Sequence, residues 1–344
     1  MTVTNQPLLL GIEIGGTKLQ LGLGRGDGEI VALERRTIEP AQGARGILAQ
    51  IGELVPILQS RIGATRDQVA AVGIGFGGPV DANTGVTTKS HQVTGWDQFP
   101  LAKWVRANLQ IPLVSIQNDA DTAGLAEARF GAGVGFSPLL YVTIGSGIGG
   151  GLLLDGQIYR GSGAGALEIG HLWVIDRTTS DFDVIKLEDV ASGWAIAGAA
   201  RNYAERQLAD GLTHWKVLEL AGGVPARIDT TMVADAAKAG DQEASFILGK
   251  AVLAMAHALN QAVTLLAPHR IILGGGVSLI GEEFWFEPIR NQLNLNVFPP
   301  FRGTFDVVPA ALGEDVVVQG ALALARDAVL NTQRSTDVAE TRPS

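Results

Sequence analysis

Glycine runs interrupt the apolar segments of this chain at five places, and they restrict its fold more than any other feature of the sequence. Glycine supplies 45 of the 344 residues, about twice the frequency of an average protein. Between strands, glycine permits positive φ angles and lets a ligand or another backbone come close. The pattern therefore predicts a chain that surrounds a ligand with backbone atoms. The runs lie at residues 15–16, 75–78, 145–151, 161–165 and 274–276.

Hydrophobic periodicity between these runs predicts an α/β fold, in which a hairpin sheet is followed by alternating strands and helices. We expect strands at residues 8–14, 17–24, 29–37, 70–75, 113–117, 139–144, 151–154, 157–160, 270–273 and 306–309. We expect helices at residues 46–61, 104–109, 122–130, 241–266 and 314–330. Residues 331–344 are polar, and we expect them to form a flexible tail.

Two segments of the chain begin with the same order of strand, glycine turn and strand, which indicates two related lobes with a ligand cleft between them. The length of 344 residues also exceeds the roughly 250–300 residues at which single cores stop growing. We expect a small N-terminal lobe of residues 1–118, completed by the helix at 314–330, and a large lobe of residues 119–313.

Composition argues against several classes of protein. The net charge is −9 and no basic stripe is present, so we expect no nucleic-acid partner. No apolar run reaches the roughly 18 residues of a membrane span, and the first residues lack the basic region of a secretory signal. We therefore expect a cytoplasmic protein with no membrane partner. The absence of cysteine excludes disulfides, thiolate zinc sites and cysteine nucleophiles.

Two glycine hairpins are candidates for phosphate binding. At Gly15 and Gly16 the backbone N–H groups and the Thr17 hydroxyl can face a phosphate, although an ordinary Gly-Gly hairpin has the same pattern. The Walker A spacing occurs nowhere in the chain. Residues 145–150 resemble a dinucleotide fingerprint, but a strand follows them where that motif requires a helix. The two hairpins together predict a phosphate clamp.

Polar residues that follow apolar segments are candidates for sugar chemistry. Asn118 and Asp119 come directly after a strand. Helix capping explains such residues, but an aspartate at the carboxyl end of a strand can also serve as a general base. Glu168 and His171 follow a glycine run and resemble contacts to sugar hydroxyls, although a lone Glu or His is more often solvated.

These motifs occur in the order found in ROK (repressor, open reading frame, kinase) sugar kinases, and the chain resembles that family over residues 8–330. The shared motifs are the two hairpins, residues 77–81, residues 95–96, the Asn118–Asp119 pair, residues 168–171 and residues 274–276.

The resemblance implies a two-lobed, actin-like ATPase fold of the ribonuclease H-like type and a sugar kinase that uses ATP and Mg²⁺. It makes Asp119 the base that accepts the proton of the attacking hydroxyl. The implied sugar-binding residues are Gly78, Asn118, Asp119, Glu168, His171 and Glu188. The implied nucleotide-binding residues are Gly15, Gly16, Thr17, Lys18, Gly145, Ser146, Gly147, Gly274, Gly275 and Gly276.

Three positions depart from the family pattern. Glu13 stands where the family usually has Asp, and its longer carboxylate would reach Mg²⁺ through water. Gln92 replaces the usual Asn before the Gly-Trp pair. The family's zinc site of one His and three Cys cannot exist here, so we expect no zinc. We expect the loop at residues 172–186 to be held by packing of Trp173, Ile175, Phe182 and Ile185; the alternative is a metal bound by Asp176, Asp181 and Asp183.

The resemblance favours glucose as the acceptor, giving glucose 6-phosphate, and a homodimer. Fructokinase, mannokinase and N-acylhexosamine kinase activities remain open, as does polyphosphate as the donor. The alternative from another class is a non-catalytic, sugar-sensing regulator of the ROK repressor type. Such repressors carry a helix-turn-helix segment before the first motif, which begins here at Gly11, and Asp119 favours an enzyme.

Overall fold

The protein divides into two compact units. The first contains Met1–Gly135, Gly151–Ala166 and Ala311–Ser344, and the second contains Phe136–Gly150 and Leu167–Ala310. The structure is a computed structural model that describes residues 7–88, 90, 93–162, 165–176, 183–212 and 214–340, with side chains as far as residue 334.

The first unit includes more of the chain than residues 1–118 and the terminal helix. Helix α3 (Asp119–Phe130) belongs to it, because α3 packs against α10 (Val316–Glu340) and strand β4 (Val69–Phe76). A boundary drawn from the sequence at Asn118 separates α3 from the elements that it contacts. Long-range packing places the observed division after residue 135 instead.

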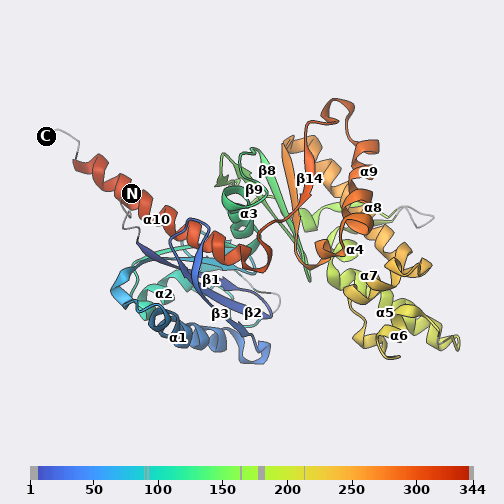
Figure 1. The fold of residues 1–344 in the computed structure, drawn as a ribbon, viewed down its shortest axis with the longest axis horizontal. Coiled ribbons are helices and arrows are strands. Elements are labelled where there is room, and N and C mark those ends of the chain that lie inside the picture. The colour runs from blue at the N-terminus through green and yellow to red at the C-terminus, as the bar shows by residue number, and fades with distance from the viewer. Residues whose placement is uncertain are drawn as a thin grey trace. The chain divides into compact units, whose positions relative to one another are not determined.

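A five-stranded mixed sheet forms the centre of the first unit (Figure 1). Its order is β3-β2-β1-β4-β7; β1, β2 and β3 are antiparallel, whereas β4 and β7 run parallel to β1. All five strands are confirmed to within one residue at either end. They are β1 (Leu8–Ile14), β2 (Lys18–Gly24), β3 (Ile30–Thr37), β4 and β7 (Leu113–Asn118), and a separate small hairpin joins β5 (Val80–Asp81) to β6 (Val86–Thr87).

One face of this sheet carries the apolar core that it shares with α1 (Gly43–Arg61) and α2 (Leu101–Leu109). Side chains alternate between the two faces of a strand, so Leu10, Ile12 and Ile14 of β1 point to the same side. They are buried in one cluster with Ile51 of α1 and Val105 of α2. The helical spacing in residues 46–61 predicted this apolar face of α1.

The opposite face is lined with glycine, and α10 lies directly on it (Figure 1). A Cβ atom on Gly73 of β4 would lie 1.8 Å from the carbonyl oxygen of Ala321. A Cβ atom on Gly11 of β1 would lie 2.7 Å from that of Val318. Since real Cβ atoms do not approach so closely, glycine at these positions allows backbone contact between helix and sheet.

Helix α3 lies against α10 in the same close manner. Asn118 caps α3 by accepting the N–H of Ala120 at 2.8 Å, so the capping interpretation of this residue is confirmed. Farther along the helix, a Cβ atom on Gly320 of α10 would lie 1.9 Å from the carbonyl oxygen of Thr122. Only glycine fits where these two helices meet.

The carboxylate of Glu127 on α3 is fully buried and accepts three backbone N–H groups. Its Oε2 atom binds the N–H of Ala132 at 2.8 Å. Its Oε1 atom binds those of Ala311 and Leu312 at 2.8 and 2.9 Å. One side chain therefore holds both the segment after α3 and the segment that leads to α10.

The second sheet has the order β10-β9-β8-β13-β14, and β13 runs parallel to both β8 and β14. Strand β9 is divided between the units: its residues up to Gly150 belong to the second unit, and those from Gly151 onward belong to the first. The strands are β8 (Leu139–Ile144), β9 (Ile148–Leu154), β10 (Gln157–Ile158), β13 (Arg270–Gly274) and β14 (Asp306–Pro309). The helices of this unit are α4 (Glu188–Ala191), α5 (Gly193–Ala209), α6 (Lys216–Leu220), α7 (Thr230–Lys238), α8 (Gln242–Leu266) and α9 (Glu287–Asn296).

Helix α8 is the central helix of the second unit, as its apolar sequence predicted. Among the described residues it is the one helix long and apolar enough to cross a bilayer, but 61% of its most apolar window is buried within the structure. A helix that is apolar on most sides and covered by its own protein is a core helix.

The loop that follows His171 differs from the sequence prediction. It forms a two-stranded sheet of β11 (Trp173–Ile175) and β12 (Val184–Lys186). Trp173 and Ile175 are 60% and 41% exposed, so the prediction that they pack the loop is wrong; Val174, which points to the other face, is buried. Ile185 is half-buried, and Phe182 and Asp181 lie outside the described residues.

Polar contacts hold this two-stranded sheet to α8. The carboxylate of Asp176 lies 2.8 Å from the Lys250 ammonium of α8. The N–H of Ile175 donates to Nδ1 of His257 at 3.2 Å. Since alternate residues of a strand face opposite sides, Val174 was the residue to expect in the core.

The terminal helix α10 continues to Glu340, ten residues beyond the predicted end at Leu330. Residues 331–340 are polar, which suggested a tail, but they contain neither glycine nor proline. Polar residues of this kind extend an existing helix at little cost, because only the first turn of a helix is hard to form.

We predict that Gly320→Ala lowers the unfolding free energy by about 1–3 kcal/mol, as overpacking in a dense core does. The added methyl group would meet the backbone of Thr122, which cannot move aside as a side chain can. Gly52→Ala on α1 is the matched control, because no atom lies within 4 Å of its Cβ position. This change should stabilise the helix by about 0.5–1 kcal/mol. Thermal and urea unfolding measure both; equal midpoints for the two variants would contradict the close α3–α10 contact.

Candidate functional site

In the first unit, four predicted site residues meet at the carboxyl ends of β1, β4 and β7. Asn118 ends β7, and its Nδ2 donates to the carbonyl oxygen of Gly78 at 3.2 Å. Asp119 begins α3, and its Oδ1 accepts the N–H of Ala120 at 2.9 Å. A Cβ atom on Gly77 would lie 3.5 Å from Oδ2 of Asp119 and 3.4 Å from Cα of Gly15. The carboxylate of Asp119 therefore lies beside the first glycine hairpin.

This closeness follows from the sheet register. Phe76 and Asn118 are paired residues of β4 and β7, and Ile14 pairs with Phe76. The N–H of Gly77 also donates to the carbonyl oxygen of Ile14 at 2.7 Å. Since parallel strands end at one edge of a sheet, the residues that follow each strand come together there.

Glu13 lies on the strand of the same hairpin and is buried, with 6% of its surface exposed. Its Oε2 accepts from Nε2 of Gln20 at 2.5 Å, and its Oε1 lies 3.3 Å from the Lys18 ammonium. Burial raises the pKa of Glu13, while the charge of Lys18 and the hydrogen bond from Gln20 oppose this rise. The carboxylate thus already has a partner on each oxygen.

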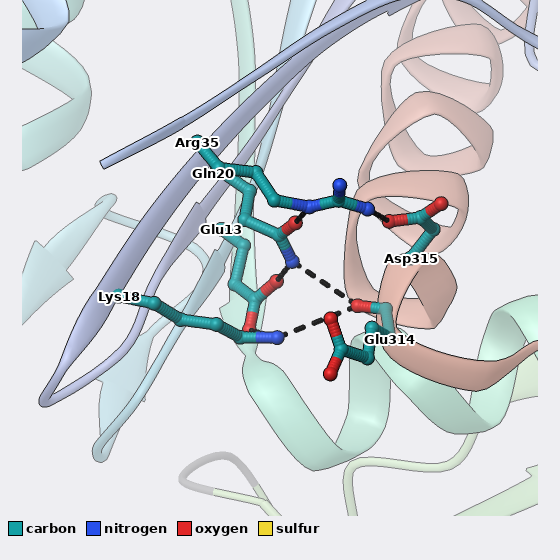
Figure 2. Close-up of polar contacts among 6 residues, drawn as sticks. All are labelled: Glu13, Lys18, Gln20, Arg35, Glu314 and Asp315. Carbon is teal, nitrogen blue, oxygen red and sulfur yellow. Dashed lines mark hydrogen bonds and ion pairs between the residues drawn. The ribbon is translucent and has the colours of Figure 1, made fainter. Parts of the chain in front are cut away.

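The network around Glu13 continues to the start of α10 (Figure 2). Nε2 of Gln20 and Nζ of Lys18 both approach the Glu314 carbonyl oxygen, at 3.1 and 3.4 Å. Arg35 of β3 connects Oε1 of Gln20 to the carboxylate of Asp315. These contacts attach the first glycine hairpin to the segment that precedes α10.

The contacts of Glu13 do not fit direct Mg²⁺ coordination, and the predicted contact through water stays a prediction. A magnesium ligand needs an oxygen that faces the ion, whereas both Glu13 oxygens face protein donors. Among the described residues, no group of three or more His, Cys, Asp or Glu side chains has the arrangement of a metal site. We derive no step through a metal held by this carboxylate.

In the second unit, the second glycine hairpin is closed by a hydrogen bond of 2.9 Å from the N–H of Gly145 to the carbonyl oxygen of Gly147. The N–H of Ile148, the next residue, donates to Oε2 of Glu188 at 2.8 Å. A Cβ atom on Gly147 would lie only 2.5 Å from the same oxygen. The structure therefore brings the predicted sugar ligand Glu188 to the predicted phosphate hairpin.

Glu168 precedes a short 3₁₀ turn, Ile169–His171, and His171 is the last residue of that turn. Leu167 has a φ of +61°, which a leucine rarely adopts. The N–H of Ile169 then donates to the carbonyl oxygen of Leu167 at 2.7 Å, around Glu168. The side chains of both Glu168 and His171 are exposed, so both can contact a ligand.

A cavity of this unit has a volume of about 590 Å³ and reaches the second hairpin at Gly145 and Ser146. Trp194 and Ala197 of α5 give it an apolar wall, together with Val277, Leu279 and Ile280. Its polar lining comes from Arg201, Asp229, Thr230, Asp235 and Lys238. An apolar wall beside polar groups and glycine N–H groups suits a nucleoside with attached phosphates.

The glycine run at residues 274–276 lies at the edge of this cavity. Gly276 lines it, and no atom lies within 4 Å of its Cβ position. Gly275, with a φ of +82°, lies against the backbone of Ile144, and Gly274 lies against Tyr141. The sequence alone did not predict the other residues that complete the cavity, because no glycine run or motif marks them. They include Gly193, the first residue of α5, and Thr230, Asp235 and Lys238 of α7.

A match to the family model of the ROK family covers residues 9–328. The chain belongs to this family, as its ordered motifs predicted. The mixed α/β architecture with two five-stranded sheets is also that of solved ROK structures.

Two similar proteins are glucokinases. One, from Thermotoga maritima, is 30% identical over 323 residues, which covers 93% of this chain and 98% of that protein. The other is a ROK family glucokinase from Streptomyces griseus, whose crystal structure was solved in complex with glucose and AMPPNP. It is 30% identical and has a TM-score of 0.76 over 93% of this chain and 99% of its own. A xylose repressor of Caldicellulosiruptor bescii is 23% identical over 92% of this chain and 77% of its own length.

The burial of Glu13 predicts a pH effect on stability. Because its pKa in the folded protein is raised above the usual 4.5, the folded state binds this proton more tightly than the unfolded state does. The stabilisation from this group is complete below pH 4.5 and is lost as the pH rises through the raised pKa. Glu13→Gln cannot titrate, so its unfolding free energy relative to the wild type should increase over that pH range, by at most about 1.4 kcal/mol per pH unit.

Urea unfolding at a series of pH values measures this difference. Glu53→Gln, at an exposed position of α1, controls for the loss of one negative charge. A difference between Glu13→Gln and wild type that falls as the pH rises would contradict the predicted direction.

Proposed function

We propose that this protein transfers the γ-phosphoryl group of ATP to a hexose hydroxyl, with glucose as the acceptor and glucose 6-phosphate as the product. The observation that supports this most is the position of Asp119. It lies at the carboxyl end of a parallel strand, beside Asn118, Gly78 and the first glycine hairpin. An enzyme that phosphorylates a hydroxyl needs such a carboxylate to accept its proton.

In the proposed reaction, the sugar hydroxyl gives its proton to the Asp119 carboxylate as its oxygen bonds to the γ-phosphorus. The bond from that phosphorus to the β,γ-bridging oxygen breaks, and ADP leaves with the electron pair. Asn118 orients Asp119 indirectly, because it caps α3 and is held by the Gly78 carbonyl. Positioning and charge stabilisation account for most of the rate in such transfers.

The nucleotide is assigned to the cavity of the second unit. Its apolar wall at Trp194 and Leu279 would take the adenine ring, and its glycine hairpin at Gly145 would approach the phosphates. Mg²⁺ enters as part of the MgATP substrate. A polyphosphate donor would leave the apolar wall without a partner, so this wall favours ATP.

The sugar is assigned to Asn118, Asp119, Glu168, His171 and Glu188. These acceptors and the His171 ring suit a hexopyranose with several hydroxyls. The sugar contacts, Gly78 included, all stay predictions, and Gln92 lies outside the described residues. The nucleotide contacts also stay predictions; they are Gly15, Gly16, Thr17, Lys18, Gly145, Ser146, Gly147, Gly274, Gly275 and Gly276. A cytoplasmic location and a homodimer also stay predictions.

A sugar-sensing regulator is the second candidate, because the xylose repressor covers most of this chain. A kinase turns over ATP in the presence of its sugar, whereas a non-catalytic regulator binds a sugar without releasing ADP. Purified protein with MgATP and a panel of glucose, fructose, mannose and N-acetylhexosamines should release ADP with at least one sugar. Binding of a sugar without ADP release would favour the regulator.

Asp119→Asn should lower kcat by roughly 10²–10⁴-fold, the usual effect of losing a general base, while glucose affinity changes little. The amide keeps the size of the side chain and can still accept the N–H of Ala120. Asp210→Asn, at an exposed position after α5, is the control. A coupled ADP assay and calorimetry measure the two effects, and a variant that keeps more than about a tenth of kcat would exclude Asp119 as the base.

Ala197→Phe should weaken nucleotide binding at least tenfold, about 1.4 kcal/mol, because its ring would fill the cavity from α5. Gly198→Ala is the matched control on the next residue, since no atom lies within 4 Å of its Cβ position. Calorimetry with AMPPNP compares the two variants. Unchanged affinity in Ala197→Phe would place the nucleotide elsewhere.

A further inference from the structure

The segment from Glu188 to Gly193 contacts the second glycine hairpin at both of its ends. At one end, Oε2 of Glu188 accepts the N–H of Ile148 at 2.8 Å. At the other, the N–H of Gly193 donates to the carbonyl oxygen of Gly145 at 2.8 Å. The hairpin is therefore held between the two ends of one short segment, which we name the 188–193 segment.

The hairpin leaves room for the Glu188 carboxylate. A Cβ atom on Gly147 would lie 2.5 Å from Oε2 and 3.3 Å from Cδ of Glu188. At Gly145, by contrast, no atom lies within 4 Å of the Cβ position. Gly147 does not have a positive φ, so the structure needs glycine there because of the carboxylate, and the backbone conformation does not require it.

The 188–193 segment leads directly into the wall of the cavity. Ser192 caps α5 by accepting the N–H of Ala195 at 3.1 Å. The carbonyl oxygen of Gly193 accepts the Thr230 hydroxyl at 2.7 Å. Gly145, Gly193 and Thr230 all line the cavity assigned to the nucleotide. A shift of the Glu188 end therefore affects residues that border this cavity.

The other side of Ile148 contacts the turn that carries Glu168 and His171. A Cβ atom on Gly170, within that turn, would lie 2.3 Å from the Ile148 carbonyl oxygen. The backbone of Ile148 is thus bound by Glu188 through its N–H and packed against Gly170 through its carbonyl. Of the sugar contacts assigned to this unit, Glu188 binds Ile148 directly, and Glu168 and His171 lie beside Gly170 in the turn that packs against it.

We propose that Glu188 is a positioning residue that couples acceptor binding to nucleotide binding. The inference rests on the proposed function. Oε2 holds Ile148, and we assign Oε1 to a sugar hydroxyl, so one carboxylate serves both ligands without competition. A hydroxyl on Oε1 restricts the carboxylate and, through Oε2, the hairpin that receives the phosphates. The hairpin then loses less conformational freedom when the second ligand binds. Each ligand therefore favours the binding of the other, which is positive coupling.

Coupling of this kind is reciprocal and typically amounts to roughly 5–150-fold in affinity. We expect the dissociation constant of AMPPNP to fall at least about fivefold in saturating glucose, and that of glucose to fall by the same factor in saturating AMPPNP. Calorimetry on the full chain measures both. Neither measurement depends on turnover.

Glu188→Asp should reduce the coupling factor to within about twofold of one. Its shorter side chain cannot hold the Ile148 N–H and a hydroxyl at the same time. Glu188→Gln keeps the length and an acceptor oxygen for Ile148, so it should keep more of the coupling than Glu188→Asp. Asp189→Asn, at the exposed neighbouring position of α4, should keep all of it. A residue that only stabilised the fold would change both affinities without changing their dependence on each other.

Gly147→Ala tests the same contact with Glu188 left intact. The methyl group would displace the carboxylate from Ile148, so the coupling factor should again fall toward one. Gly198→Ala on α5 adds the same methyl group outside the cavity lining, where no atom lies within 4 Å of the Cβ position, so the coupling should persist. Should Glu188→Asp fail to fold, as judged by circular dichroism, this pair decides the question.

Three outcomes would overturn the proposal. The first is a wild-type protein that binds the two ligands independently. The second is full coupling in a folded Glu188→Asp variant, and the third is equal coupling in Gly147→Ala and Gly198→Ala. The proposed function fails separately: ligands that couple as expected with no ADP release leave the role of Glu188 intact and exclude the kinase. Failure of the wild type to bind any hexose rejects both.

Discussion

The contact between helix α10 and the glycine-lined face of the first sheet supports most of the first unit. Because Gly11 and Gly73 have no side chains, the helix backbone lies directly on the strands. This proximity brings the Glu314 carbonyl, just before the helix, within reach of Lys18 and Gln20. The position of the first hairpin thus depends on a helix some 300 residues later in the sequence, a separation that the chain closes only by packing.

A carboxylate organises each of three places in the molecule: Glu13 and Glu127 are buried, Glu188 is half-buried, and the partners of the three differ. Glu13 is surrounded by side-chain donors, Glu127 by backbone N–H groups from two segments, and Glu188 by one backbone N–H. Buried charges need such partners because unsatisfied burial is costly. The two with backbone partners fix loop geometry directly, whereas Glu13 fixes it through Gln20 and Lys18.

The sequence predicted the strands of both sheets and the order of the motifs well, because alternation and glycine turns are local signals. Long-range contacts are where it fell short. Nothing local to Asp119–Phe130 indicates that α3 packs on α10, and nothing near Gly193 or Thr230 marks the cavity wall. Hydrophobicity alone predicts that Trp173 and Ile175 pack in the core, whereas in the structure Val174 is the residue that points there. The hydrogen bond between Glu188 and Ile148 also could not be predicted without the fold, because the two residues lie 40 positions apart in the sequence.

The dependence of the first sheet on α10 has a consequence for synthesis of the chain on the ribosome. Strand β1 precedes every other described element, whereas the helix that covers Gly11, Gly22 and Gly73 follows all of them. At a synthesis rate of roughly 5–20 residues per second, the time between synthesis of β1 and synthesis of α10 is on the order of 15–60 s. The glycine-lined face of the sheet stays uncovered until α10 is made. The second unit has all of its residues before α10 is made. The nascent first sheet is therefore the part of this protein most exposed to chaperones and to aggregation.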